Sequence, residues 1–188
     1  MYQICVSGAA KGVSVEEGRD LALQIGQEIA KAGHTLMTGA TIGLPNYAAE
    51  GYKKAGGRMS LGISPASSKA EHILKYSLPT KNYDSILYSG MHYVGRDSLL
   101  ITSSDAVISI GGRLGTLHEF TIAIESDTPI GFVHGAGGIE EEIKILLSIA
   151  KPLRRNIFIT FSKDPKDMVS KLTKHLDQKY QEYKDIYY

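Results

Sequence analysis

Three glycine-rich turns are the features of this sequence whose residue types and spacing could do chemistry. Each turn follows a short apolar run, and each precedes a segment with helical patterning. Glycine lets backbone N–H groups approach a ligand closely, and the N-terminus of a following helix attracts anions. We therefore predict a phosphate-bearing small molecule, a nucleotide, as the partner, with plain connecting turns as the alternative. The predicted binding residues are Ser7, Gly8, Gly39, Ala40, Gly43, Gly111, Gly112, Arg113, Gly115 and Thr116.

Glu119 follows the third turn and has two interpretations. Thr116 and Glu119 have the spacing of a capping box, which alone would account for both residues. Alternatively, the helix N-terminus keeps a carboxylate ionised at the mouth of the turn, where it serves as a base or stabilises positive charge. Arg96 likewise is either a solvated or salt-bridged helix arginine or a residue of the site.

Several common sites are excluded by the motifs that are missing. GGRLGT is not a P-loop, GAAKG is not a dinucleotide fingerprint, and no G-x-S-x-G elbow occurs. The six histidines show no HExxH spacing, and the single cysteine, Cys5, cannot form an intrachain disulfide or the usual zinc sites. We therefore predict no metal and no cofactor.

Composition indicates one ordinary globular domain over residues 1–188. Lys and Arg number 21 against 20 Asp and Glu, which argues against a nucleic-acid partner or a polybasic membrane surface. No apolar run approaches the roughly 20 residues of a membrane span, and the N-terminus lacks the pattern of a signal peptide. With the lone cysteine, these features predict a cytoplasmic protein.

Elements that could position these residues alternate along the chain. Strands are predicted over residues 2–7, 34–38, 58–63, 85–88, 106–110, 130–133 and 157–161. Helices are predicted over 14–32, 45–55, 91–104, 117–125, 139–150 and 165–180, the first with a capping box at Ser14 and Glu17. Residues 66–84 are unpatterned and fit a short helix, a flap or a lid. The mostly continuous apolar strands predict a three-layer α/β/α sandwich with a doubly wound, mainly parallel sheet.

Motifs along the chain resemble the Lonely Guy (LOG) family of the SLOG Rossmann-like superfamily, long labelled possible lysine decarboxylases. Gly62 to Pro65 match the family's G-I-x-P strand end, and TGATIG matches its G-G-G-x-x-G turn loosely. Residues 91–96 and 111–119 fall where the family has its M-x-x-R-K helix and P-G-G-x-G-T-x-x-E turn. This chain departs from the family in having Gly111-Gly112-Arg113 for P-G-G and Asp97 for the lysine.

The resemblance implies a phosphoribohydrolase, which cleaves the N-glycosidic bond of a nucleoside 5′-monophosphate to give free base and ribose 5-phosphate. It puts Glu119 and Arg96 at the catalytic positions, and it implies a homodimer formed by helices beside the site. The apolar helix with Met91, Leu99, Leu100 and Ile101 is the candidate contact, or else a core helix. The competing interpretation is a non-catalytic carrier or sensor of a nucleotide or of a cofactor such as the molybdenum cofactor. Nothing marks a pyridoxal phosphate lysine, so the decarboxylase label is rejected.

Overall fold

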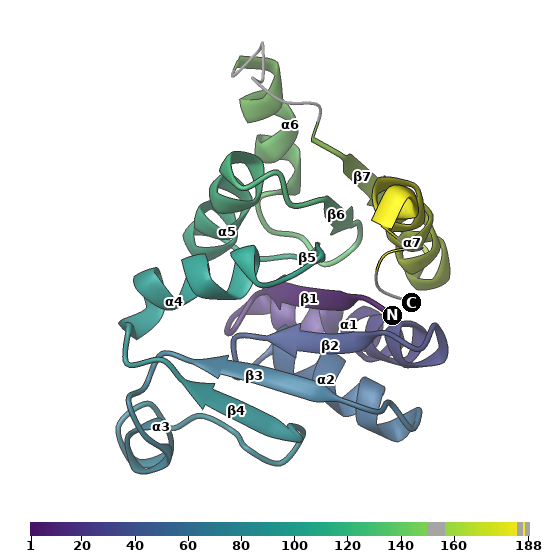
Figure 1. Ribbon diagram of the computed structural model, residues 1–188. Coiled ribbons are helices and arrows are strands. Elements are labelled where there is room, and N and C mark those ends of the chain that lie inside the picture. The colour runs from purple at the N-terminus through teal and green to yellow at the C-terminus, as the bar shows by residue number, and fades with distance from the viewer. Residues whose placement is uncertain (150–156, 184–185, 187–188) are drawn as a thin grey trace.

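A seven-stranded sheet, parallel throughout, organises the computed structural model, which describes residues 1–149, 157–183 and 186 (Figure 1). The strand order is β4-β3-β2-β1-β5-β6-β7, so the chain builds outward from β1 in one direction and then restarts at β5 on its other side. This confirms the predicted doubly wound sheet. The strands are β1 (Gln3–Gly8), β2 (Thr35–Thr38), β3 (Ser60–Ser64), β4 (Ser85–Tyr88), β5 (Ala106–Ile110), β6 (Ile130–Val133) and β7 (Ile159–Ser162).

Helices cover both faces of the sheet and make the outer layers of a sandwich. One layer contains α1 (Val13–Lys31), α2 (Leu44–Lys54) and α7 (Pro165–Lys179). The other contains α4 (His92–Thr102), α5 (Leu114–Glu125) and α6 (Glu140–Ile149). The short α3 (Lys69–Leu74) occupies the stretch that had no sequence pattern, and a 3₁₀ turn, η1 (Gln181–Tyr183), follows α7.

Two hydrophobic cores fill the space between the layers. Along β1, Ile4 and Val6 belong to the core under α1, α2 and α7, whereas Cys5 belongs to the core under α4, α5 and α6. All three side chains are at most 1% exposed. A central strand buried on both faces explains why its sequence is continuously apolar rather than alternating.

The two helices beside the first and third glycine turns begin earlier than predicted. The N-cap residues of α1 and α5 are Gly12 and Arg113, and no side chain caps either helix. Both predicted capping boxes are therefore wrong, because Ser14 and Thr116 already lie inside their helices. Side-chain caps occur instead at Ser68 before α3 and at Asp164 before α7.

Helices α1 and α2 pack unusually closely, and glycines make this possible. A Cβ built at Gly26 would lie 1.9 Å from the carbonyl oxygen of Ala48, and one at Gly51 would lie 2.0 Å from that of Leu23. These two glycines therefore serve helix packing, not ligand binding.

No helix in the described ranges is long and apolar enough to cross a membrane. The predicted helix end at Ala150 falls outside the described residues, as does part of the C-terminal tail. That residues 1–188 form one domain stays a prediction.

Candidate functional site

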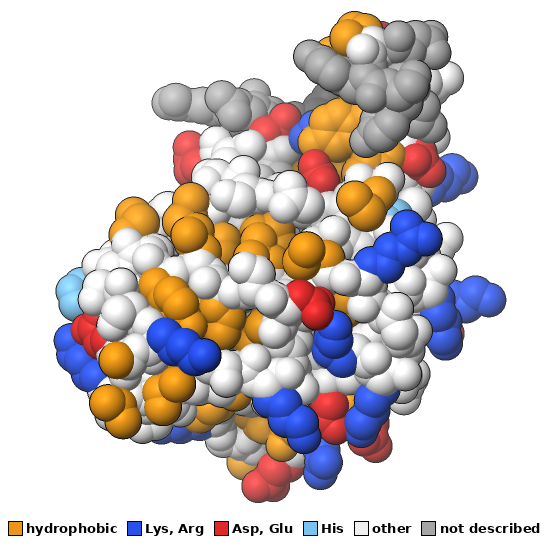
Figure 2. Space-filling view, turned by 60° about the horizontal axis from the view of Figure 1, so that its bottom comes forward, with side chains coloured by type: hydrophobic (Ala, Val, Ile, Leu, Met, Phe, Trp, Pro, Cys, Tyr) orange, Lys and Arg blue, Asp and Glu red, His pale blue; other side chains and the backbone are white. Residues whose placement is uncertain are grey.

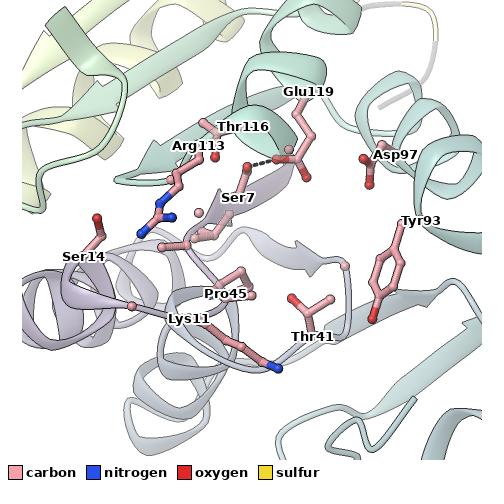
Figure 3. Close-up of a pocket in the computed structure, with 18 of the residues that line it drawn as sticks. Ser7, Lys11, Ser14, Thr41, Pro45, Tyr93, Asp97, Arg113, Thr116 and Glu119 are labelled. Carbon is pink, nitrogen blue, oxygen red and sulfur yellow. Dashed lines mark hydrogen bonds between the residues drawn. The ribbon is translucent and has the colours of Figure 1, made fainter. Parts of the chain in front are cut away.

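A cleft of about 450 Å³ opens at the carboxyl ends of β1 and β5, where the strand order reverses (Figure 3). This is the place where open α/β sheets bind ligands. The cleft is lined by Val6, Ser7, Gly8, Ala9, Ala10, Lys11, Gly12, Ser14, Gly39, Thr41, Pro45, Tyr93, Arg96, Asp97, Gly112, Arg113, Gly115, Thr116 and Glu119. Of the residues predicted from sequence, only Ala40, Gly43 and Gly111 are missing from this lining.

The first and third turns bring two uncapped helix N-termini to one end of the cleft. No side chain caps the first turn of α1 or of α5. In α1 the N–H of Val15 donates to the carbonyl of Gly12 at 2.9 Å, and the N–H groups before it have no partner within the helix. Arg113 adds an exposed cation there, and the exposed Lys11 extends from the first turn toward Thr41. Neither cation has an ion-pair partner among the described residues. The Arg113 guanidinium reaches across to the first turn, 3.2 Å from where a Cβ on Gly12 would lie. This end of the cleft is suited to an anion.

The second turn is shaped by packing rather than by an open anion site. A Cβ at Gly39 would lie 1.6 Å from Nη1 of Arg96, so this glycine makes room for the arginine. Gly43 packs on the backbone of Ala9 and Ala10, and the N–H of Leu44 donates to the carbonyl of Ala9 at 2.9 Å. Pro45, next in α2, has no N–H to offer.

Glu119 extends from α5 into the cleft, where its carboxylate accepts a hydrogen bond from the hydroxyl of Ser7. Burial, followed by the negative charge of Asp97, raises the pKa of Glu119 to about 7. The prediction that the helix N-terminus keeps Glu119 ionised is therefore wrong. The residue lies in the second turn of α5, beyond the reach of the helix dipole. Near neutral pH, Glu119 populates both the acid and the carboxylate.

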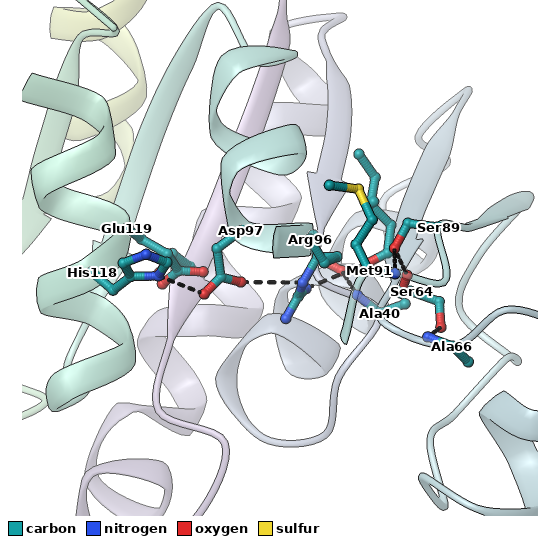
Figure 4. Close-up of polar contacts among 12 residues, drawn as sticks. Ala40, Ser64, Ala66, Ser89, Met91, Arg96, Asp97, His118 and Glu119 are labelled. Atoms are coloured by element: carbon teal, nitrogen blue, oxygen red, sulfur yellow. Dashed lines mark hydrogen bonds and ion pairs between the residues drawn. The ribbon is translucent and has the colours of Figure 1, made fainter. Parts of the chain in front are cut away.

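Arg96 is buried in the cleft wall, with 4% of the residue exposed. Its Nε lies 3.1 Å from Oδ1 of Asp97, and its Nη1 donates to the carbonyl of Ile63 at 3.3 Å. The other oxygen of Asp97 is 3.1 Å from Nδ1 of His118, so that Arg96, Asp97 and His118 form a row beside Glu119 (Figure 4). Arg96 is therefore salt-bridged, as the first of its two interpretations has it, and it also lines the cleft, whereas its role in a functional site stays a prediction.

Lys11, Tyr93 and Asp97 line the cleft but were not predicted. Lys11 lies within SGAAKG, so the first turn itself carried the signal. Tyr93 and Asp97 stand three residues before and one residue after Arg96, and helical spacing could have placed Tyr93 on the same face as the arginine. Within the described ranges, no three His, Cys, Asp or Glu residues are grouped so as to hold a metal ion.

The chain belongs to the SLOG cluster4 family, which it matches over residues 1–169. A relative described as an uncharacterized protein of Archaeoglobus fulgidus is 34% identical over 125 residues, which cover 66% of this chain and 75% of that protein.

Solved structures confirm the SLOG-type Rossmann-like fold. TM1055, a structural genomics target, is 26% identical with a TM-score of 0.79, and the match covers 93% of this chain and 99% of the other. The molybdenum cofactor binding protein from Rippkaea orientalis is 23% identical with a TM-score of 0.74, covering 93% and 97% of the two chains. DNA processing protein A from Helicobacter pylori, described with a single-stranded DNA binding mode, is 16% identical with a TM-score of 0.63, covering 93% and 81%. These latter two likenesses concern the fold alone.

Proposed function

We propose that this protein binds a phosphorylated nucleotide or nucleotide-like cofactor, with its phosphate at the α1–α5 end of the cleft. The observation that carries the proposal is the meeting of Arg113 with two helix N-termini that no side chain caps, in a cleft that Lys11 also lines. Backbone N–H groups and cationic side chains bind phosphate oxygens through charge-assisted hydrogen bonds. A molybdenum cofactor binding protein among the structures of similar fold places that cofactor within the ligand class to be tested.

Gly115 offers a clean test because it lines the cleft and has free space around it. A Cβ built at Gly115 meets no atom within 4 Å, and the residue lies in the first turn of α5. Gly115→Glu would put a carboxylate where the phosphate is expected, at a position where acidic residues favour helices. Loss of binding in this variant would therefore not follow from unfolding.

The measurement is titration calorimetry with AMP, and with the molybdenum cofactor as a second ligand. We expect Gly115→Glu to weaken binding at least about tenfold, or about 1.4 kcal/mol, while the matched Gly115→Ala variant stays close to the parent. If Gly115→Glu binds either ligand as tightly as the parent does, the phosphate does not lie over this turn. If the parent binds neither ligand, the proposed function is wrong for these ligands.

A second candidate, hydrolysis of the N-glycosidic bond of a nucleoside 5′-monophosphate, is favoured by Glu119. Hydrolysis breaks the bond between C1′ and the base nitrogen, adds a water oxygen at C1′ and delivers one proton of that water to the departing base. A carboxyl with a pKa of about 7 can give a proton to the base or accept one from water. Its ionised form can also stabilise an oxocarbenium-like ribose. Buried Arg96 would help to orient the ribose.

The assay is release of free base from a panel of nucleoside monophosphates by the parent and by Glu119→Gln. If the protein is a hydrolase, the amide variant should lose nearly all turnover, since an amide neither takes up a proton nor balances positive charge. Binding of the monophosphate should change little, because the proposed phosphate contacts remain. A parent that binds nucleotide and releases no base would exclude hydrolysis of these substrates and leave the binding function standing.

A further inference from the structure

Tyr93 is an aromatic side chain in the wall of the cleft. Figure 3 shows its ring on α4, across the cleft from Arg113, the N-cap residue of α5. The residue is 45% exposed, so a large part of it is open to the cleft or to solvent. Among the described residues that line the cleft, no other has an aromatic ring.

Neighbouring side chains hold this ring in place without a ligand. The ring of Tyr76 contacts it edge-on, with centroids 5.6 Å apart and planes at 78°. The guanidinium carbon of Arg96 lies 5.8 Å from its centroid, and Asp97 and the backbone of Ile63 fix that guanidinium in turn. A ring whose orientation is already set loses little further freedom when it binds a ligand.

The chemistry of the cleft therefore changes from one end to the other. Arg113 and the N-termini of α1 and α5 make an anion-binding end, and Tyr93, with the guanidinium of Arg96 beside it, makes an aromatic end. Aromatic side chains stack on the faces of planar heterocycles and tolerate different bases, because every base has a π-face.

We propose that Tyr93 is the stacking platform for the planar nitrogen heterocycle of the phosphorylated ligand. The ligand then lies along the cleft with its phosphate over α1 and α5, its ring on Tyr93 and its middle portion near Glu119. The inference rests on the proposed function, and it adds that ligands without a planar ring gain nothing from Tyr93.

The competing explanation is that Tyr93 belongs to a contact between subunits. Met91 at the N-cap of α4, Val94 on α4 and Leu114 on α5 are also large and exposed, at 47%, 71% and 80%. Val94 does not line the cleft, so Val94→Ser changes this apolar surface and leaves the ring in place. That variant is the matched control.

The experiment compares AMP with ribose 5-phosphate, which has the phosphate and the sugar but no base. Binding of both is measured by calorimetry for the parent, Tyr93→Leu, Tyr93→Phe and Val94→Ser, with an unfolding midpoint for each protein. We expect Tyr93→Leu to weaken the binding of AMP at least about fivefold and to leave the binding of ribose 5-phosphate unchanged. Tyr93→Phe keeps the ring, so it and Val94→Ser should bind AMP within about twofold of the parent.

Other outcomes overturn the inference in distinguishable ways. If Tyr93→Leu weakens both ligands equally, the side chain acts by shaping the cleft and not by stacking. If Tyr93→Leu weakens the binding of neither ligand, Tyr93 is not the platform. The same conclusion follows if Val94→Ser weakens the binding of AMP as much as Tyr93→Leu does. If the parent binds neither AMP nor ribose 5-phosphate, the proposed function fails first. If Tyr93→Leu does not fold, the test falls to Tyr93→Phe. An unchanged affinity of Tyr93→Phe for AMP supports the inference. If Tyr93→Phe binds AMP only as weakly as ribose 5-phosphate, the inference is overturned.

Discussion

Glu119 has two neighbours that act on its charge in opposite directions. The Ser7 hydroxyl donates to the carboxylate and lowers its pKa, whereas burial and the charge of Asp97 raise the pKa more strongly. The position of Glu119 could be predicted from its spacing after GGRLGT, but its protonation could not. The pKa depends on α4 bringing Asp97 against α5, a contact between segments that no local pattern encodes.

The stability of the protein should therefore fall as Glu119 ionises. An unfolded glutamate has a pKa near 4.3, and the folded one has a pKa of about 7, so folding favours the protonated form. The stabilisation is complete below pH 4.3 and is lost as the pH rises through 7. Across this window we expect the free energy of unfolding to fall by about 2 kcal/mol relative to Glu119→Gln, after discounting for partial solvent access.

The measurement is urea unfolding of parent and Glu119→Gln at intervals from pH 4.5 to 8.5. Subtracting the two curves removes the titration of all the other groups. A constant difference between the proteins over this range would show that Glu119 has an ordinary pKa.

At the scale of elements, the glycine turns divide into two kinds that look alike in sequence. The turns before α1 and α5 leave helix N-termini open to the cleft, whereas the turn before α2 is closed by packing on Arg96 and Ala9. Sequence could predict that all three turns lie at the carboxyl ends of strands. Sequence could not distinguish the open turns from the closed one, because the difference lies in which distant backbone and side-chain atoms fill the space beside each glycine.

Gly112 and Gly115 should respond oppositely to alanine. Gly112 has a φ of +103°, and a Cβ there would lie 1.8 Å from Oγ1 of Thr116. Gly112→Ala should therefore lower the free energy of unfolding by about 2 kcal/mol or more. Gly115 lies in the first turn of α5 with open space around it, so Gly115→Ala should raise that energy by about 0.5 kcal/mol. Chemical denaturation of both variants checks this, and equal effects would mean that α5 begins elsewhere.

At the scale of the whole molecule, the order of elements was the most predictable feature. Continuous apolar strands separated by amphipathic helices permit few arrangements other than a parallel sheet covered on both faces. The homodimer is harder to predict from sequence, because the same apolar pattern on a helix fits packing in the core or at a subunit contact. Leu100 and Ile101 are at most 1% exposed and belong to the core, so they are not available for a subunit contact.

The exposed apolar side chains of α4 leave another surface for a dimer. Hydrophobic side chains gather on the left of Figure 2, the side on which Figure 1 places α3 and α4. Met91 and Val94 are 47% and 71% exposed, and burying them against a second copy would remove apolar area from water. We therefore predict a homodimer in which α4 contributes to the contact.

Light scattering across micromolar concentrations checks this prediction. The parent should have the mass of a dimer, and Val94→Asp should shift it toward the monomer, because two carboxylates would be buried at the contact without partners. Met59→Asp is the matched control, since Met59 is 45% exposed and precedes β3, at the amino ends of the strands and so opposite the cleft. A parent that has the monomer mass throughout would overturn the dimer. If both aspartate variants dissociate equally, the effect of charge is general and α4 is not the contact.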